Sequence, residues 1–417
     1  MSSQNGIAEQ ALQPDFYRRI KPRTFPAERA MWYVLVIISI IAFLEVLPTL
    51  LEPAGAGAAL LATGYALIPV AAIGLFVLFI DRWEPEPKRM YLVAFMWGAG
   101  ASVLIALIFN GLVSDALSGI YYGIRGTNVS DSDTFFASYV APLTEETIKG
   151  AGVLLIYFVF RRHFNGPIDG IVYGALIGSG FAFSENILYF VRYYDSIGTI
   201  FQVRFLDGPL NHEAWTAVFG FFVGIAAEKV GMNGKKNSLK DIWKWLVPGF
   251  VFAVLGHWVN NDALNWTWMT YERYMFINNV PQIIVLASLV IFASRQERNY
   301  IRKGLEDYLQ AGWLTAEDLK LIDSIKLRRS AQSWAEGVAL AHGEEPGVGT
   351  NRMKRFLRLL LELGYARTVA VKTGTVNTEV NRKFETQVLA ELTDTRQKLN
   401  SFSAQAAALG AGRNERI

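Results

Sequence analysis

Long apolar runs alternate with short polar segments along the first 294 residues of the chain. Eight runs have the length, about 20 residues, that a helix needs to cross the hydrocarbon core of a bilayer. They are Met31–Leu50, Ala58–Ile80, Met90–Val113, Ser138–Phe160, Ile171–Val191, Pro209–Ala227, Ile242–Leu264 and Phe276–Ser294. The pattern predicts an all-α, polytopic membrane helix bundle with about eight transmembrane helices.

The composition agrees with a membrane protein. The chain is 52% hydrophobic and 18% charged, whereas about a quarter of the residues of a soluble protein are charged. It has no cysteine, which excludes disulfides, thiolate nucleophiles and cysteine-ligated metals. The net charge of +3 is too small to indicate nucleic acid. The lipid bilayer is therefore the expected environment.

Changes in composition predict three regions. Residues 1–30 are polar and interrupted by proline, so we expect a tail rather than a cleavable signal peptide. Residues 31–294 form the membrane-embedded region. Residues 295–417 contain amphipathic patterns with charged faces, which predict a small soluble helical region with a flexible end.

Basic residues predict the orientation of the chain in the membrane. Five precede the first run, and further basic clusters follow the second, fourth and sixth runs, whereas the opposite loops hold only Arg125, Arg192, Arg204 and Arg273. Because lysine and arginine concentrate in cytoplasmic loops, both termini are expected in the cytoplasm. The protein is then a multi-pass protein of the cell membrane.

Four of the runs carry polar side chains that are unusual for a bilayer. The fourth contains EETIK (Glu145, Glu146, Lys149), the fifth FAFSEN (Phe181, Glu185), the sixth begins NHEAWT (His212, Thr216) and the seventh ends GHWVNND (His257, Asn261). A charged residue at mid-membrane costs about 2.5–3.5 kcal/mol on insertion scales, so such residues are by default functional.

The expected depths of these side chains indicate a shared site. Glu145 lies roughly 10 Å below the outer end of its run, and Glu185 roughly 9 Å below the outer end of the next. His212 begins its run on the outer side, and His257 and Asn261 end theirs there. Four helices of alternating direction thus place polar residues at one level, in the outer third of the bundle.

Carboxylate, imidazole and amide groups at one depth are typical of a hydrolase. A buried glutamate can take a proton from water, and imidazole and amide donors can stabilise the oxyanion that forms when this water attacks a carbonyl. The same groups are also ordinary zinc ligands, so zinc remains an option, with Glu145, His212 and His257 as candidate ligands. Their spacing matches no recognised zinc motif, which favours a metal-free mechanism.

Other polar residues in the sequence do not identify a catalytic or metal site. HEAWT lacks the second histidine of the zinc motif H-E-x-x-H, and the glycine-flanked Ser179 is typical of helix packing rather than of a nucleophile. Glu146 and Lys149 could form a structural ion pair. Glu213 and Asp262 point away from their neighbours and are expected to meet water at the membrane surface. His163 is expected to be a loop residue without a partner.

Taken in order, these motifs resemble the PrsW family of intramembrane proteases, within the wider group of CAAX prenyl endopeptidases and Abi proteins. The matching elements are Glu145-Glu146-x-x-Lys149, Phe181-x-x-x-Glu185, His212-x-x-x-Thr216 and His257-x-x-x-Asn261. The segment DRWEPEPKR (Asp81–Arg89) is similar to an Asp…Pro-Glu-Pro loop of the family. The resemblance covers roughly Met31 to Ser294.

The resemblance implies roles for these residues. Glu145 would activate water, with Glu146 and the supporting Lys149 holding it in place. Glu185 would stand in the second motif, where the CAAX relatives have histidine. His212 would act beside the water, and His257 with Asn261 would stabilise the oxyanion. The implied partner is a membrane-anchored protein cleaved on its outer side, as in first-site cleavage of an anti-sigma factor. Whether a metal is used stays open.

Two hypotheses from other classes compete with peptide hydrolysis. The ionisable cluster could serve an ion-coupled transporter as a relay, or the chain could be a non-catalytic scaffold whose C-terminal helices recruit partners. A relay would string ionisable groups across the full membrane, whereas the inner halves of these runs are apolar. The sequence therefore favours a peptidase.

Overall fold

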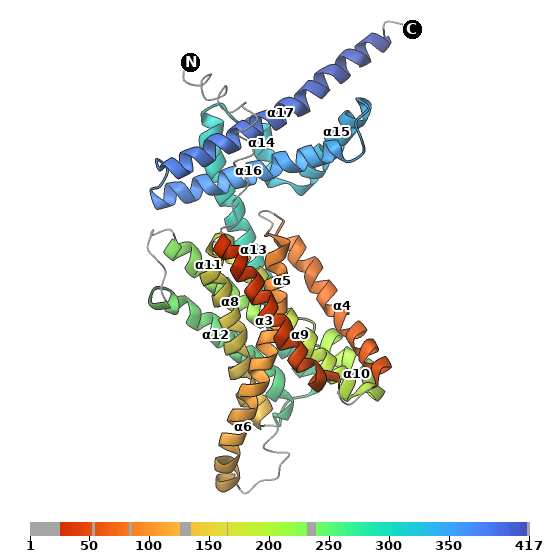
Figure 1. Ribbon diagram of the computed structural model, residues 1–417, viewed down its shortest axis with the longest axis vertical. Coiled ribbons are helices and arrows are strands. Elements are labelled where there is room, and N and C mark those ends of the chain that lie inside the picture. The colour runs from red at the N-terminus through yellow and green to blue at the C-terminus, as the bar shows by residue number, and fades with distance from the viewer. Residues whose placement is uncertain are drawn as a thin grey trace. The chain divides into compact units, whose positions relative to one another are not determined.

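A computed structural model describes residues 26–51, 55–82, 86–125, 135–164, 166–231 and 239–414. Every regular element among these residues is a helix, and no strand is present in them (Figure 1). The prediction of an all-α polytopic protein is confirmed. Residues 1–25 of the predicted N-terminal tail and residues 83–85 of the Asp81–Arg89 loop lie outside the described residues.

The described residues divide into two compact units at Ser294–Arg295, a boundary that lies within helix α13. The helices of the first unit are α3 (Pro26–Leu51), α4 (Ala56–Ile80), α5 (Lys88–Met96), α6 (Val103–Arg125), α8 (Ala141–Val159), α9 (Pro167–Arg192), α10 (Ile197–Phe201), α11 (Asn211–Gly231), α12 (Leu239–Asp262) and the first part of α13 (Tyr271–Gln310). Between them lie the π-helical segments η1 (Trp97–Ser102), η2 (Phe136–Val140) and η5 (Gln202–Leu206), and the 3₁₀ segments η3 (Arg161–His163), η4 (Tyr194–Ser196) and η6 (Ala263–Asn265).

All eight apolar runs form helices, but only six helices in the described part of the chain are long and apolar enough to qualify as membrane spans. The other two, α8 and α11, carry the charged and imidazole side chains of the first and third motifs. Those side chains are buried among neighbouring helices. A helix enclosed in this way need not be apolar on every side, which explains why length and apolarity alone recover six spans rather than about eight.

Helix α9 forms the centre of the membrane unit and packs against α4, α5, η1, α8 and, most extensively, α11. Its contact with α11 includes two glycines, Gly174 and Gly178, which are four positions apart in the sequence. A Cβ atom at Gly174 would lie 2.3 Å from the Thr216 carbonyl oxygen, and one at Gly178 would lie 2.4 Å from the His212 carbonyl oxygen. Small residues at this spacing let membrane helices approach closely. The glycines therefore fix His212 beside the polar end of α9.

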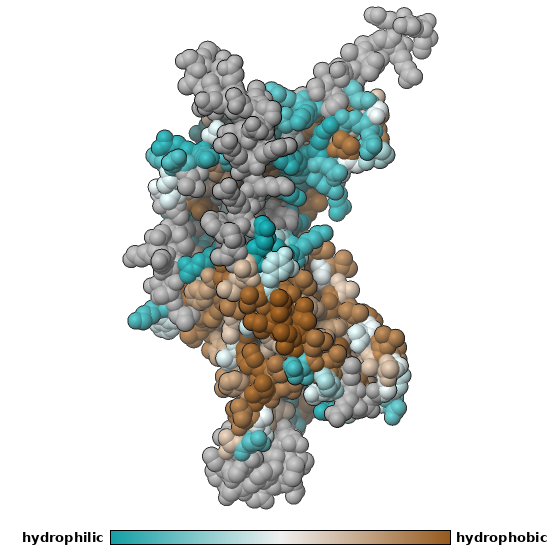
Figure 2. Space-filling model, viewed as in Figure 1, coloured by the Kyte–Doolittle hydropathy of each residue, from teal (hydrophilic) through white to brown (hydrophobic). Residues whose placement is uncertain are grey.

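The outward surface of the membrane unit is apolar. Large side chains such as Leu60, Leu75 and Phe276 are more than half exposed, and Figure 2 shows a broad apolar surface over α3 and its neighbours. In a soluble protein such a surface would mark an interaction site. Here it matches the lipid-facing surface of a membrane bundle.

The second unit contains the end of α13 with α14 (Ala316–Asp323), α15 (Ile325–Ala341), α16 (Val348–Thr373) and α17 (Glu379–Asn414). Helix α14 begins at a capping box in which the Thr315 hydroxyl accepts from the Asp318 amide. Leucines of α16 such as Leu360 and Leu363 are fully buried. The amphipathic pattern of this region thus forms packed helices.

Candidate active site

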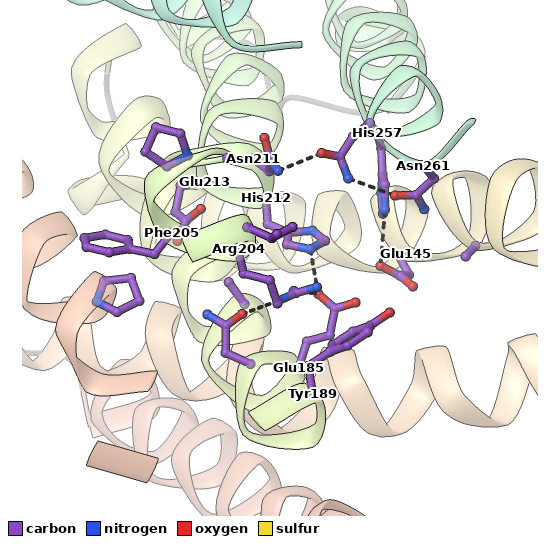
Figure 3. Close-up of a pocket in the computed structure, with 18 of the residues that line it drawn as sticks. Glu145, Glu185, Tyr189, Arg204, Phe205, Asn211, His212, Glu213, His257 and Asn261 are labelled. Atoms are coloured by element: carbon purple, nitrogen blue, oxygen red, sulfur yellow. Dashed lines mark hydrogen bonds and ion pairs between the residues drawn. The ribbon is translucent and has the colours of Figure 1, made fainter. Parts of the chain in front are cut away.

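A cavity of about 330 Å³ lies at one end of the membrane bundle. Helices α8 and α11 begin at this end, and α9 and α12 finish there. The polar residues that line the cavity are Glu145 of α8, Glu185, Asn186 and Tyr189 of α9, Arg204 of η5, Asn211, His212 and Glu213 of α11, His257, Asn260 and Asn261 of α12, and Tyr274 of α13 (Figure 3). The structure therefore brings Glu145, Glu185, His212, His257 and Asn261 together in one place.

Glu146 and Lys149 lie behind the cavity wall, fully buried, with Lys149 Nζ 2.5 Å from Glu146 Oε1. They hold the imidazoles rather than Glu145. Glu146 Oε1 lies 2.9 Å from Nδ1 of His257, and Lys149 Nζ lies 2.9 Å from Nδ1 of His212. The expectation that both residues hold Glu145 is replaced by this arrangement, because the side chains of α8 reach across to α11 and α12.

Glu185 and His212 form the next pair. His212 Nε2 lies 2.8 Å from Glu185 Oε2, so with Lys149 donating to Nδ1 the imidazole is neutral and donates from Nε2. Arg204 donates to Glu185 Oε2 and to Asn186 Oδ1, both at 2.5 Å, and its guanidinium lies 4.2 Å from the centre of the Tyr189 ring. Glu185 is thus held from two sides.

His257 faces Glu145 across the cavity. Its Nε2 lies 3.9 Å from Glu145 Oε2, while Nδ1 contacts Glu146, and its ring stacks on Trp215 with centroids 4.5 Å apart. A carboxylate on Nδ1 and an aromatic surface on the ring together fix the direction of Nε2. The nitrogen therefore points toward Glu145, as Figure 3 shows.

The geometry of Glu145, His212 and His257 fits a metal ion. One ligand atom from each residue lies within 4.8 Å of the other two, and all three residues are buried. Oε2 of Glu145 is buried and accepts no hydrogen bond from the part of the chain that the structure describes, as expected for an oxygen that would bind a cation. Two imidazoles and a carboxylate are a common zinc ligand set.

Asn261 is the end of a chain of amide side chains. Asn211 donates to Asn260 Oδ1 at 2.7 Å, Asn260 donates to Asn261 Oδ1 at 2.9 Å, and Asn261 donates to the Ala137 carbonyl oxygen at 2.9 Å. The chain joins α11, α12 and η2. It leaves the second amide hydrogen of Asn261 available to a group in the cavity.

Phe181 and Thr216, the remaining motif positions, are buried around the same site. Lys149 Nζ lies 4.6 Å from the centre of the Phe181 ring, which also packs against the His212 imidazole. The Thr216 hydroxyl is buried and has no hydrogen-bond partner among the described residues. Phe181 therefore packs against both the ammonium of Lys149 and the imidazole of His212.

Three sequence expectations are wrong. Glu213 and Asp262 are 6% and 7% exposed rather than at a watery surface; Glu213 lines the cavity, and Asp262 accepts a hydrogen bond from the Trp266 indole at 2.8 Å. His163 has a partner, since its Nδ1 lies 3.5 Å from Glu86 Oε2. In each case a contact from a neighbouring segment, which the local pattern does not contain, buries or pairs the side chain.

Sequence reasoning missed Arg204, Trp215 and Asn260. In the sequence, Arg204 was used only as one of the basic residues that predict the orientation of the chain. It is, however, an arginine in an apolar stretch beside the polar end of a predicted span. This position could have indicated that Arg204 belongs to the site. Asn260 stands in a run of asparagines, and nothing in its pattern separates it from Asn261.

Comparisons with known proteins identify relatives of the membrane unit. A family model described as "PrsW family intramembrane metalloprotease" matches residues 86–293. "Protease PrsW" of Clostridioides difficile (strain 630) is 27% identical over 240 residues, which cover 57% of this chain and 92% of that protein. "Protease PrsW" of Geobacillus kaustophilus (strain HTA426) is 30% identical over 188 residues, which cover 44% of this chain and 73% of that protein.

"Protease PrsW" of Bacillus subtilis (strain 168) is 28% identical over 207 residues, covering 48% of this chain and 86% of that protein. No solved structure matches the chain significantly. The family model ends at residue 293, so the second unit lies beyond it. The family is described as one of metalloproteases. This description disagrees with the metal-free mechanism that was favoured by the sequence spacing of Glu145, His212 and His257.

Proposed function

Because the chain belongs to the PrsW family of intramembrane proteases, we propose that it cleaves a membrane-anchored protein near the outer face of the membrane. The observation that carries this proposal is the cavity in which Glu145 faces His212 and His257 inside a membrane bundle. Hydrolysis requires water in the bilayer interior, and a polar cavity at one end of the bundle can supply it.

The outer position rests on the orientation of the chain. If the basic loops are cytoplasmic, both termini are cytoplasmic and the first residues of α8 and α11 lie on the outer side. The polar residues that line the cavity belong to that end of the helices. A substrate bond presented at this level would lie just below the outer membrane surface.

We assign a metal ion, with zinc as the best match, to Glu145, His212 and His257. Such an ion lowers the pKa of a bound water and polarises the substrate carbonyl. The chain's own groups orient this set: Glu146 holds Nδ1 of His257 and Lys149 holds Nδ1 of His212. The first contact leaves Nε2 of His257 directed to the cavity, whereas metal binding by Nε2 of His212 would replace the hydrogen bond of that atom to Glu185.

Glu145 is also the group proposed to take a proton from the attacking water. Its Oε2 is buried and accepts no hydrogen bond from the described residues, so the carboxylate has an oxygen that could accept this proton. We assign the available amide hydrogen of Asn261 to the developing oxyanion. Glu185, held by Arg204, keeps the His212 ring in place.

The substrate class that family membership supports is a membrane-anchored anti-sigma factor cleaved at its first site. Such a protein would present one membrane helix and an outer segment to the cavity. The apolar outward surface of the bundle would let that helix approach through the lipid. Neither the transporter nor the scaffold hypothesis is favoured by an observation in the described residues.

The test compares membrane-protein fragments in cells that carry the wild type, Glu145→Ala or Glu272→Ala at equal expression. Glu272 is an exposed glutamate near the start of α13 and serves as the matched control. Specific fragments should disappear in Glu145→Ala and persist in Glu272→Ala, which would identify the substrate as well. Identical fragment patterns in all three strains would contradict the proposed peptidase reaction.

A further inference from the structure

Glu213 is the buried ionisable residue in the cavity that the proposed reaction does not use. Glu213 follows His212 directly, is 6% exposed and lines the cavity. Within the described residues its only hydrogen-bonding contact is with its own backbone amide. Burial of a carboxylate without a cation or strong donors destabilises the folded state. The position of Glu213 is therefore not explained by a contribution to the stability of the fold.

The basic side chains of the same site, Arg204 and Lys149, already have other hydrogen-bond partners. Arg204 binds Glu185 and Asn186, and Lys149 binds Glu146 and His212. Breaking either arrangement to pair with Glu213 would leave another buried carboxylate uncompensated. The cation that would complete Glu213 is therefore expected to come from outside the protein.

Glu213 lies in a different part of the cavity from the proposed metal ligands. Successive residues of a helix project about 100° apart, and Figure 3 shows Glu213 beside Phe205, on the opposite side of His212 from Glu145. Pro69 and Ala182 line the same cavity. The carboxylate thus has an apolar ring beside it, which suits an occupant with an aliphatic stem and a charged end.

We propose that Glu213 forms a subsite for a lysine or arginine side chain of the substrate, close to the bond that is cleaved. The stem would pack against Phe205, and the charged end would pair with the carboxylate in a charge-assisted hydrogen bond. This inference rests on the proposed peptidase function and adds a substrate class to it. It assigns specificity to Glu213 and the chemical step to Glu145.

The test uses the full chain in proteoliposomes with a library of single-span reporter proteins whose residues at the outer membrane face are randomised. The wild type should cleave sequences with lysine or arginine at one fixed position about 10- to 100-fold faster than those with glutamine there. Glu213→Gln should abolish this preference, and Glu213→Lys should shift it toward aspartate or glutamate. Glu272→Gln, an exposed control, should keep the wild-type preference.

A wild type without a basic preference, or a Glu213→Gln variant that retains one, would overturn the subsite. Glu145→Gln on the same library separates the two proposals, because normal cleavage by that variant contradicts the catalytic assignment and leaves the preference measurable.

A second measurement needs no variant. Butylguanidinium should inhibit wild-type cleavage, and its uncharged analogue butylurea should inhibit about 10- to 100-fold less. Equal inhibition by the two compounds would also overturn the subsite.

Discussion

Lys149 Nζ lies 2.9 Å from Nδ1 of His212, although the two residues come from different helices and are 63 positions apart. The same ammonium lies 2.5 Å from Glu146, whose carboxylate contacts His257. One buried lysine thus connects both imidazoles of the site. This places the first and third sequence motifs in a single hydrogen-bonded unit.

Replacing Lys149 with methionine should therefore weaken both the fold and the site. The change removes one partner of a fully buried ion pair and leaves Glu146 uncompensated, at a cost of about 3–5 kcal/mol in the free energy of unfolding. It also frees the His212 ring. We expect a lower thermal midpoint in detergent and loss of substrate cleavage.

Lys398→Met is the matched control, because Lys398 pairs with Asp394 on an exposed face of α17. Exposed pairs contribute about 0–1 kcal/mol, so this variant should unfold near the wild-type temperature. A Lys149→Met protein as stable and active as the control would contradict the role of Lys149.

Metal removal should inactivate the enzyme. Incubation with a strong chelator should abolish cleavage, and added zinc should restore it, since Glu145, His212 and His257 would supply the ligands. Elemental analysis should find zinc in the purified wild type and much less in His257→Ala. His342→Ala, at the end of α15, is the control and should retain the metal. Full activity in the chelator would show that no exchangeable metal is required.

Substitution of Gly178 by alanine should displace His212. The added Cβ would lie 2.4 Å from the His212 carbonyl oxygen, so α11 must move away from α9. Overpacking of this kind costs about 1–3 kcal/mol, and a shift of about 1 Å at a catalytic group can cost about 100-fold in rate.

A Cβ atom at Gly64 of α4 would have no atom of the described residues within 4 Å, so Gly64→Ala should be neutral or slightly stabilising. Comparison of cleavage rates and unfolding temperatures for the two variants checks this prediction. Equal rates would show that the α9–α11 spacing tolerates a side chain.

Asp81 should make stability depend on pH. Burial raises the pKa of its carboxyl from the usual value of 3.8 to about 7, despite hydrogen bonds from the Glu86 amide and the Tyr91 hydroxyl. The folded protein therefore binds this proton more tightly than the unfolded chain. The stabilisation is fully present below the unfolded pKa and is lost as pH rises through about 7.

Asp81→Asn should remove this loss, because an amide keeps an acceptor oxygen but cannot ionise. Unfolding temperatures measured across the pH range should converge at acidic pH and favour the variant above about 7. The exposed Asp195→Asn is the control and should follow the wild type. Parallel curves for wild type and Asp81→Asn would contradict the prediction.

The orientation of the chain can be checked with reporters. A fusion after Ser294 should report the cytoplasm, and one inserted between Arg125 and Phe135, within the segment Ser114–Ser138, should report the outside, because the basic loops are expected to stay inside. The reverse result would place the cavity near the cytoplasmic face and would rule out cleavage on the outer side.

The sequence by itself determined the class of the protein and the identity of most of the site. Apolar runs of bilayer length in a chain of this composition indicate membrane helices. A carboxylate or imidazole inside such a run has a high free energy of insertion, which indicates a functional residue. Glu145, Glu185, His212 and His257 were recognised on that basis, since the insertion cost is a local property of each residue. The shared level of the motifs followed from helix rise and direction alone.

Only the tertiary structure decided which side chains meet. The rotation of each helix about its axis and its distance from its neighbours are set by packing, as by Gly174 and Gly178 against α11. Ligands contributed by three helices need no characteristic spacing, which is why the sequence pattern favoured a metal-free mechanism. For the same reason Glu213 was expected in water, and the pairing of Arg204 with Glu185 went unnoticed. These contacts join segments whose proximity no local pattern contains.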